Sequence, residues 1–148
     1  MEKNEFITNL KNLISGERDM TAVLANTTAY IKEVYGWFWI GFYIVRNEEL
    51  VLGPFQGSVA CYRIKKGRGV CGTSWQKDAT IVVPDVEKFP GHIACSSLSK
   101  SEIVVPLHDP EGNVRAVLDI DSDRLASFGS PEQEVLEAAA KIVAQQVF

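Results

Sequence analysis

The stretch that decides the fold is Trp37-Phe38-Trp39-Ile40-Gly41-Phe42-Tyr43-Ile44-Val45, an uncharged run rich in aromatic and β-branched side chains. Such composition predicts a β-strand. Four polar residues, 46–49, separate it from a second apolar run at 50–55, so we expect the two runs to pair as a hairpin. Side chains alternate along a strand, which would place Trp37, Trp39 and Tyr43 on one face and Phe38 and Phe42 on the other.

Helical periodicity precedes this hairpin. Apolar residues recur at helical spacing over residues 6–14 and again over residues 20–34. Gly16 and Gly36 stand where the two helices would end, and Asp19 is placed to cap the second helix. The sequence therefore predicts two N-terminal helices.

Shorter signals follow the hairpin. We expect further strands at residues 60–65, 81–83, 102–107 and 114–120, with a short helix at 70–76 and a turn at 109–113. Ser130 as N-cap, Pro131 at the first helical position and Gln133 completing a capping box predict a last helix. The order of elements predicts an α+β domain over residues 1–148, with helices laid against a largely antiparallel sheet.

Composition excludes several classes of protein. The chain has 148 residues, of which 46% are hydrophobic, and this suits one domain with a single core. The formal net charge is −4 and the longest basic cluster is 65–68, which argues against nucleic-acid binding. No apolar run approaches the roughly 20 residues that span a bilayer. The N-terminus does not resemble a signal peptide, so we expect a cytoplasmic protein with no membrane partner.

Three cysteines, Cys61, Cys71 and Cys95, fall in the middle of the chain. An odd number in a reducing compartment favours redox, metal or catalytic roles over static bridges. Cys95 lies on a loop, and Glu102 follows seven positions later where a strand begins. A thiolate nucleophile beside a proton donor is one interpretation of this pair. A buried cysteine beside an edge-strand acid is an equally good one on this segment alone.

Two further acids, Asp119 and Asp121, alternate with Leu118 and Ile120. Strand alternation places both acids on one face and the two apolar side chains on the other. Acids that cluster raise each other's pKa, so one of these groups could stay protonated and act as an acid. The alternative is a pair of solvated acids at a strand end.

Five segments together resemble the GAF-domain free methionine-(R)-sulfoxide reductases, and they cover nearly the whole chain in one order. They are Trp39-Ile40-Gly41-Phe42-Tyr43, Leu52-Gly53-Pro54-Phe55-Gln56-Gly57, Gly69-Val70-Cys71-Gly72-Thr73, the segment from Phe89 to Leu107, and Val117-Leu118-Asp119-Ile120-Asp121-Ser122. One departure is Ser96 after Cys95, where members of the family have an acidic residue. That change would alter the local field of the thiol.

The resemblance implies a GAF fold and a thiol-dependent oxidoreductase that acts on free L-methionine-(R)-sulfoxide under oxidative stress. It implies Cys95 as nucleophile, Cys61 as the principal resolving thiol and Cys71 as an alternate or relay, against the simpler reading of Cys71 as a packed core residue. The redox-active disulfide would be recycled by thioredoxin, with no cofactor and no metal, and a homodimer stays open.

The resemblance also implies roles for the acids and aromatics. Glu102 and Asp121 would serve in protonation of the sulfoxide and in placing the substrate, Asp119 would hold the ammonium group, and Trp39 and Tyr43 would form a wall for the methyl group. We expect Trp75 to serve packing. For His92 we favour a hydrogen bond to a loop carbonyl over a role in lowering the thiol pKa.

Two other functions are weighed against this one. The GAF fold also serves as a small-molecule sensor, so a ligand-binding domain without catalysis is the first alternative. A structural zinc site is the second, because the donor types suit tetrahedral zinc, although their spacing resembles no zinc knuckle. Its ligands would be Cys61, Cys71, Cys95 and His92.

Overall fold

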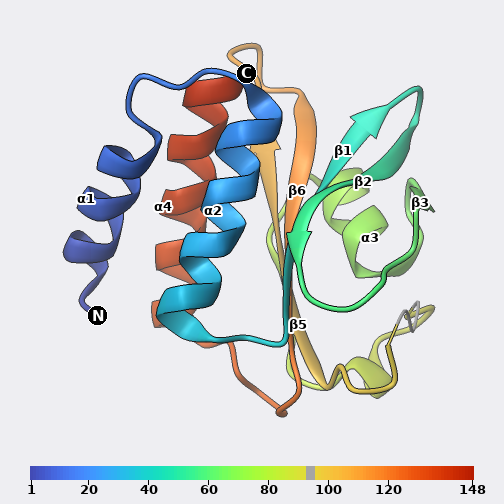
Figure 1. Cartoon of the computed structure of the whole chain (residues 1–148). Helices are drawn as coiled ribbons and strands as arrows, with labels where there is room; N and C mark the ends of the chain where they lie inside the picture. Colours follow the sequence, from blue (N-terminus) through green and yellow to red (C-terminus); the bar gives the residue numbers. More distant parts are fainter. Residues whose placement is uncertain (93–95) are drawn as a thin grey trace.

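The computed structural model describes residues 1–92 and 96–148. Figure 1 shows a sheet with helices on both sides. Helices α1 (Lys3–Ile14), α2 (Met20–Tyr35) and α4 (Ser130–Val147) lie on one side, with α1 outermost, and α3 (Gly69–Lys77) lies on the other. In the described part of the chain, no helix is both long enough and apolar enough to cross a membrane.

The sheet has six strands in the order β3-β2-β1-β6-β5-β4, and all five neighbouring pairs are antiparallel. This confirms the predicted α+β class with an antiparallel sheet. The strands are β1 (Trp39–Arg46), β2 (Glu49–Gln56), β3 (Arg63–Lys65), β4 (Ile81–Val83), β5 (Ser101–His108) and β6 (Val114–Ser122), and a 3-10 turn, η1 (Val86–Lys88), follows β4.

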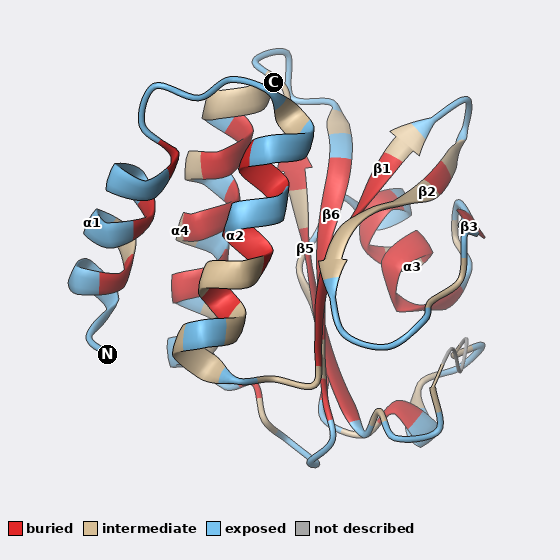
Figure 2. Cartoon of the chain, viewed as in Figure 1, coloured by how far each residue is buried: buried red, intermediate tan, exposed pale blue. Residues whose placement is uncertain are grey.

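Strand alternation separates two apolar clusters, one on each face of the sheet. The larger cluster fills the space between the sheet and helices α1, α2 and α4, and Figure 2 marks buried residues along these helices and strands in red. Leu118 and Ile120 point into it, as predicted. The smaller cluster lies under α3 and contains Trp39, Tyr43 and Val104. Because the large cluster holds three central strands in register, the opposite face is free to carry polar groups.

The predicted hairpin is confirmed, and it turns tightly. Asn47 and Glu48 connect β1 to β2 with φ of 49° and 66°. Two consecutive residues with positive φ are the hallmark of a type I′ turn, whose twist matches that of the paired strands. This turn fixes the register in which Arg46 faces Glu49.

For the aromatic run, the predicted side-chain faces are confirmed for the residues within β1 but are wrong for the two residues that precede the strand. Trp39 and Tyr43 share the α3 face, and Phe42 lies on the helical face. Trp37, however, packs on the helical side and stacks on Tyr35 at 4.3 Å between ring centroids, whereas Phe38 joins the α3-side cluster. The reason is that β1 begins only at Trp39, so alternation does not extend to the two residues before it.

The ends of α2 follow the predicted capping. The Asp19 side chain accepts a hydrogen bond from the Ala22 backbone N–H at 3.0 Å, satisfying one of the free donors of the first turn. At the other end Gly36 has φ of 71° and donates its N–H to the Lys32 carbonyl at 2.9 Å. Glycine adopts this left-handed conformation without a steric penalty, so it ends the helix.

The start of α4 corrects the predicted cap by one residue. Ser130 is the first helical residue, and the N-cap is Gly129. The carboxylate of Glu132, rather than Gln133, accepts the Gly129 backbone N–H at 2.7 Å. An ionised carboxylate is the stronger acceptor and also interacts favourably with the helix N-terminus, which explains why it takes the capping position.

Two substitutions test this cap. Glu132→Ala removes the acceptor of the Gly129 N–H, so we expect a loss of about 1 kcal/mol in the free energy of unfolding. Ser130→Ala removes no capping bond and should change that free energy by less than about 0.5 kcal/mol. Urea denaturation measures both. A larger loss in the serine variant would restore Ser130 as the N-cap.

Candidate active site

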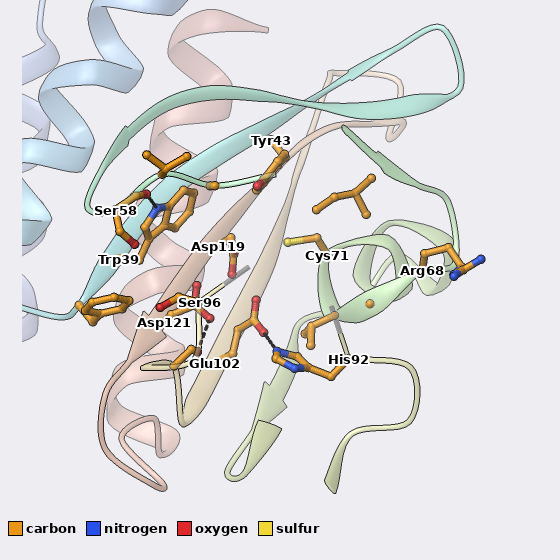
Figure 3. A pocket seen from close by; sticks show the side chains of 17 residues that line it. Trp39, Tyr43, Ser58, Arg68, Cys71, His92, Ser96, Glu102, Asp119 and Asp121 are labelled. Atoms are coloured by element: carbon orange, nitrogen blue, oxygen red, sulfur yellow. Dashed lines mark hydrogen bonds and ion pairs between the residues drawn. The ribbon is translucent and has the colours of Figure 1, made fainter. Parts of the chain in front are cut away.

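A pocket opens on the α3 face of the sheet, and three neighbouring strands supply its polar floor. In the sheet register Trp39 of β1 faces Asp121 of β6, and Asp121 faces Glu102 of β5. Residues far apart in the sequence thus stand side by side across the strands. Asp119 lies two residues before Asp121 on the same face, as the alternation predicted. Figure 3 shows these side chains projecting into one pocket with Cys71 and His92.

The three carboxyl groups form a crowded cluster with few compensating partners. Glu102 and Asp119 are buried, with 5% and 6% of their surfaces exposed. Ser99 Oγ donates to Asp121 Oδ1 at 3.0 Å, whereas Asp119 Oδ1 is buried and has no hydrogen-bond partner among the residues that the structure describes. A buried acceptor left unpaired is costly, so a donor that enters the pocket would be stabilised at this oxygen.

Burial and mutual repulsion keep protons on these acids. Burial, followed by the charge of Asp121, raises the pKa of Glu102 to about 8. Burial also raises the pKa of Asp119 and of Asp121 well above the usual range, with the charges of Glu102 and Asp119 respectively adding to it. At neutral pH Glu102 therefore carries a proton and can act as an acid.

His92 lies beside this cluster. Its Nε2 is 3.6 Å from Glu102 Oε1, and burial lowers the pKa of the imidazole although Asp119 opposes the shift. The sequence favoured a loop carbonyl as the partner of His92, which stays a prediction; the structure adds a contact of the ring with Glu102. The contact joins a loop to β5, so no local spacing could have indicated it.

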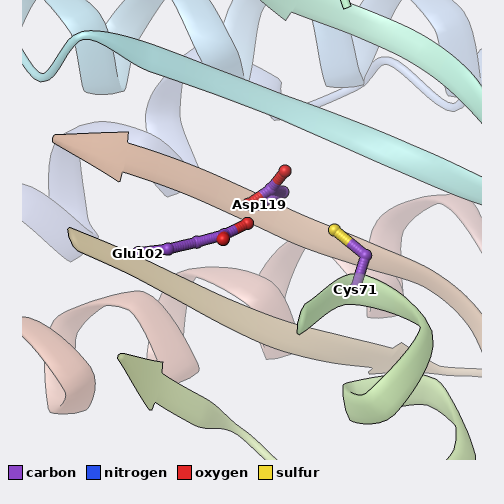
Figure 4. A group of neighbouring side chains, drawn as sticks. All are labelled: Cys71, Glu102 and Asp119. Carbon is purple, nitrogen blue, oxygen red and sulfur yellow. The ribbon is translucent and has the colours of Figure 1, made fainter. Parts of the chain in front are cut away.

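Cys71 reaches the same cluster from α3. Its thiol is free and buried, and Figure 4 shows it beside Asp119 and Glu102. Burial, then the charge of Asp119, raises the pKa of the Cys71 thiol well above its ordinary value. The thiol therefore stays protonated and is a poor nucleophile.

The ligand atoms of Cys71, Glu102 and Asp119 lie within 4.8 Å of one another, so these are the described residues that could hold a metal ion. This set differs from the zinc set considered from the sequence. One of the four ligands of that set, Cys95, lies outside the described residues, so the structure does not test it.

An aromatic wall closes one side of the pocket. The Trp39 indole stacks on Phe55 at 5.2 Å and on Tyr43 at 6.1 Å between centroids. Its Nε1 donates to the Ser58 carbonyl at 2.9 Å, and the Tyr43 hydroxyl donates to the Cys61 carbonyl at 2.9 Å. The wall thus also fastens the loop that carries Cys61.

Gly41 makes room for the indole. A Cβ at this position would lie 2.4 Å from Trp39 Cη2 and 2.5 Å from Phe55 Cβ. These distances are far below van der Waals contact, so only glycine lets the indole lie over the strand backbone. The group that approaches the strand backbone at Gly41 is therefore this indole ring.

A positive group at the pocket was missed by sequence reasoning. Arg68, which is exposed, and the first residues of α3 are among the residues that line the pocket. Gly69, with φ of 60°, is the first residue of α3. Because Gly69 also lines the pocket, the N-terminus of this helix lies at the pocket. An arginine and a helix N-terminus both favour an anion. The signal was the Gly67-Arg68-Gly69 sequence before a predicted helix.

Two further predicted residues can be placed. Trp75 is buried in the α3-side cluster, with Lys66 Nζ 4.9 Å from its ring centroid, which fits the expected packing role. Ser96 lines the pocket. Cys95, the predicted nucleophile, lies outside the described residues.

The profile of the GAF domain family matches residues 19–147. The chain belongs to the GAF domain family. It is 58% identical over 135 residues to GAF domain-containing protein A of Dictyostelium discoideum, covering 90% of this chain and 85% of that protein. It is 43% identical over 150 residues to the free methionine-R-sulfoxide reductase of Escherichia coli, and this match covers 98% of this chain and 88% of that protein.

Among solved structures, a free methionine-R-sulfoxide reductase from Neisseria meningitidis in complex with its substrate superimposes with a TM-score of 0.94. That protein is 50% identical, and the match covers 97% of this chain and 87% of the other. The resemblance stated from five sequence segments is thereby confirmed. The GAF fold also accounts for the six-stranded antiparallel sheet flanked by helices.

A substitution at Gly41 tests whether the Trp39 indole needs a glycine beneath it to pack over the strand. Gly41→Ala inserts a methyl group against Trp39 and Phe55, so we expect a loss of about 1–3 kcal/mol in unfolding free energy and an altered tryptophan fluorescence spectrum. Gly53→Ala in β2 is the comparison, since its Cβ would make a tight contact of 3.1 Å with the Phe42 carbonyl oxygen but no overlap like that at Gly41, so it should cost less. Equal losses in both variants would contradict a special role for Gly41.

Proposed function

We propose that this protein reduces free L-methionine-(R)-sulfoxide to methionine. The observation that carries the proposal is the row formed by Trp39, Asp121 and Glu102 across three strands, which sets a buried, protonated carboxyl beside an aromatic wall. A sulfoxide requires both features, since its oxygen must be protonated and its methyl group must be held. Relatives named free methionine-R-sulfoxide reductases, 40% and 43% identical, support the same activity.

The pocket offers a place for each part of the substrate. The α-ammonium group donates to the orphaned Asp119 Oδ1, and the α-carboxylate faces Arg68 and the start of α3. The methyl group rests on the Trp39 indole. These contacts place the sulfoxide oxygen toward Glu102 and Asp121, so binding also orients the reacting group.

The chemistry begins with proton transfer from Glu102 to the sulfoxide oxygen. The Cys95 thiolate then attacks sulfur, which leaves methionine and a Cys95 sulfenic acid that carries the oxygen. The Cys61 thiol condenses with the sulfenic acid to give a disulfide and water. Thioredoxin returns both cysteines to thiols and itself becomes a disulfide, which fits a cytoplasmic enzyme.

Cys61 suits the resolving role better than Cys71 does. Its loop lines the rim of the pocket, and Tyr43 fixes its carbonyl position. Cys71 is buried among acids that keep its thiol protonated, and a protonated thiol attacks slowly. We therefore propose Cys71 as the alternate thiol, used when Cys61 is unavailable.

Substrate discrimination is the first test of this function. A peptide-bound methionine sulfoxide has a neutral amide in place of the ammonium group and leaves Asp119 unpaired, so its kcat/KM should be about 10²-fold lower or worse. The S epimer should also be poor, because its methyl group and oxygen exchange places against the wall. Chromatographic detection of methionine with dithiothreitol as reductant measures all three. Equal rates on free and peptide-bound sulfoxide would contradict the proposal, and tight binding without turnover would favour a GAF sensor.

The cysteines are separated by single-turnover measurements. Cys95→Ser should form no methionine. Cys61→Ser should release up to one methionine per site and then turn over slowly with thioredoxin, because resolution follows product formation and is left to the protonated Cys71 thiol. Cys71→Ser is the control and should keep both the first turnover and recycling. Methionine formation at the normal rate in Cys95→Ser would show that another residue is the nucleophile.

A further inference from the structure

The segment that carries Cys61 has an unusual charge for this protein. The chain has a formal net charge of −4, yet residues 50–77 contain no aspartate or glutamate. The same segment contains five cationic residues, Arg63, Lys65, Lys66, Arg68 and Lys77. Four of them follow Cys61 within seven positions, and all four are exposed. Arg63 is paired with Glu49 at 2.7 Å, so Lys65, Lys66 and Arg68 supply the excess positive charge of a cationic strip that follows Cys61 on an otherwise acidic molecule.

Exposed apolar side chains adjoin the same segment. Val59 and Tyr62 flank Cys61 and are 87% and 78% exposed. Leu98, 60% exposed, lies on the loop whose residues Ser96 and Ser99 line the same pocket as Val59. These three belong to a small group of large apolar side chains that the described residues leave exposed. Val59 itself lines the pocket, and Tyr62 and Leu98 lie on the two loops that contribute residues to it. Exposed apolar side chains on such loops mark an interaction surface more often than chance exposure does.

Hydrogen bonds from buried residues fix the backbone of the loop at residues 58–62, which carries Val59 and Tyr62. Trp39 and Tyr43 donate to the carbonyls of Ser58 and Cys61, and the Tyr62 carbonyl accepts the Leu52 backbone N–H at 2.9 Å. Three hydrogen bonds over five residues fix the backbone while Val59 and Tyr62 face solvent. A preorganised apolar surface loses little conformational entropy on binding, as a docking site requires.

We propose that Val59, Tyr62 and Leu98, together with the cationic strip at residues 63–68, form a docking surface for an acidic protein that carries a redox-active dithiol. The proposal rests on the proposed function, because that function leaves a disulfide at Cys61 for the partner to reduce. Opposite charges steer the two proteins together, and the apolar side chains hold them in register. A small dithiol such as dithiothreitol can reduce the disulfide without charge steering and without these apolar contacts.

The transfer at this surface balances as a two-electron exchange. One thiolate of the partner attacks Cys61 Sγ, which breaks the bond to Cys95 and releases the Cys95 thiolate. The second thiol of the partner then attacks the partner sulfur that is bonded to Cys61 in the mixed disulfide. This forms the partner's disulfide and releases the Cys61 thiolate. The partner ends as a disulfide, and this protein ends with two thiols after uptake of two protons.

Reduction of the oxidised full-length protein tests the surface without methionine sulfoxide. Thioredoxin, kept reduced by its reductase and NADPH, or dithiothreitol is added, and new thiols are counted by alkylation and intact mass. For Tyr62→Ser/Leu98→Ser we expect the second-order rate constant with thioredoxin to fall about 10-fold, since truncated anchor residues carry most of such binding energy. The rate with dithiothreitol should stay within about twofold of wild type.

Two controls complete the experiment. Leu13→Ser changes an exposed leucine on α1, the outermost helix on the opposite side of the sheet from α3, and should leave both rates unchanged. A higher sodium chloride concentration should slow the reduction by thioredoxin but not the reduction by dithiothreitol. Lys65→Gln should make the rate with thioredoxin less dependent on salt. An equal loss with both reductants in the double variant, or no loss with thioredoxin, would overturn the docking surface. Because thiols are counted directly, failure to reduce methionine sulfoxide would overturn the proposed function alone.

Discussion

The site depends on the burial of three carboxyl groups on one face of an antiparallel sheet. The Trp39 wall and α3 pack around them, and the charge of each acid raises the pKa of another. A low local dielectric and like charges both disfavour ionisation, so protons are retained that an exposed acid would lose at neutral pH. The acid chemistry, the orphaned oxygen of Asp119 and the protonated state of Cys71 all follow from this arrangement.

The helical layer makes the arrangement possible. Apolar side chains on the opposite face of β1, β5 and β6 pack against α1, α2 and α4, and a slip of one residue in any of these strands would expose them. The same register sets Trp39 against Asp121 and Asp121 against Glu102. Stability of the core and geometry of the site are therefore fixed by one set of strand pairings, while the loops that carry Cys61 and Leu98 lie at the rim.

Local sequence rules predicted much of this and missed what depends on distant contacts. The shared face of Asp119 and Asp121, the caps of α2 and the 47–48 turn region follow from patterns within a few residues. The predicted faces of Trp37 and Phe38 and the predicted Ser130 cap were wrong, because the strand and helix boundaries lie one or two residues from where they were expected. The contact of His92 with Glu102, the place of Arg68 and the proximity of Cys71 to Asp119 need the tertiary structure, since each joins separate elements.

The central claim is that Glu102 holds a proton at neutral pH because it is buried among other carboxyls. The most direct measurement is a pH titration of the Glu102 side-chain carbon by ¹³C NMR on the reduced protein, with Glu102→Gln used to assign the signal. We expect a midpoint near 8 for wild type, in keeping with the raised pKa. A midpoint near the ordinary glutamate value of about 4.3 would contradict the claim, because the carboxyl would then be ionised when it is needed as an acid.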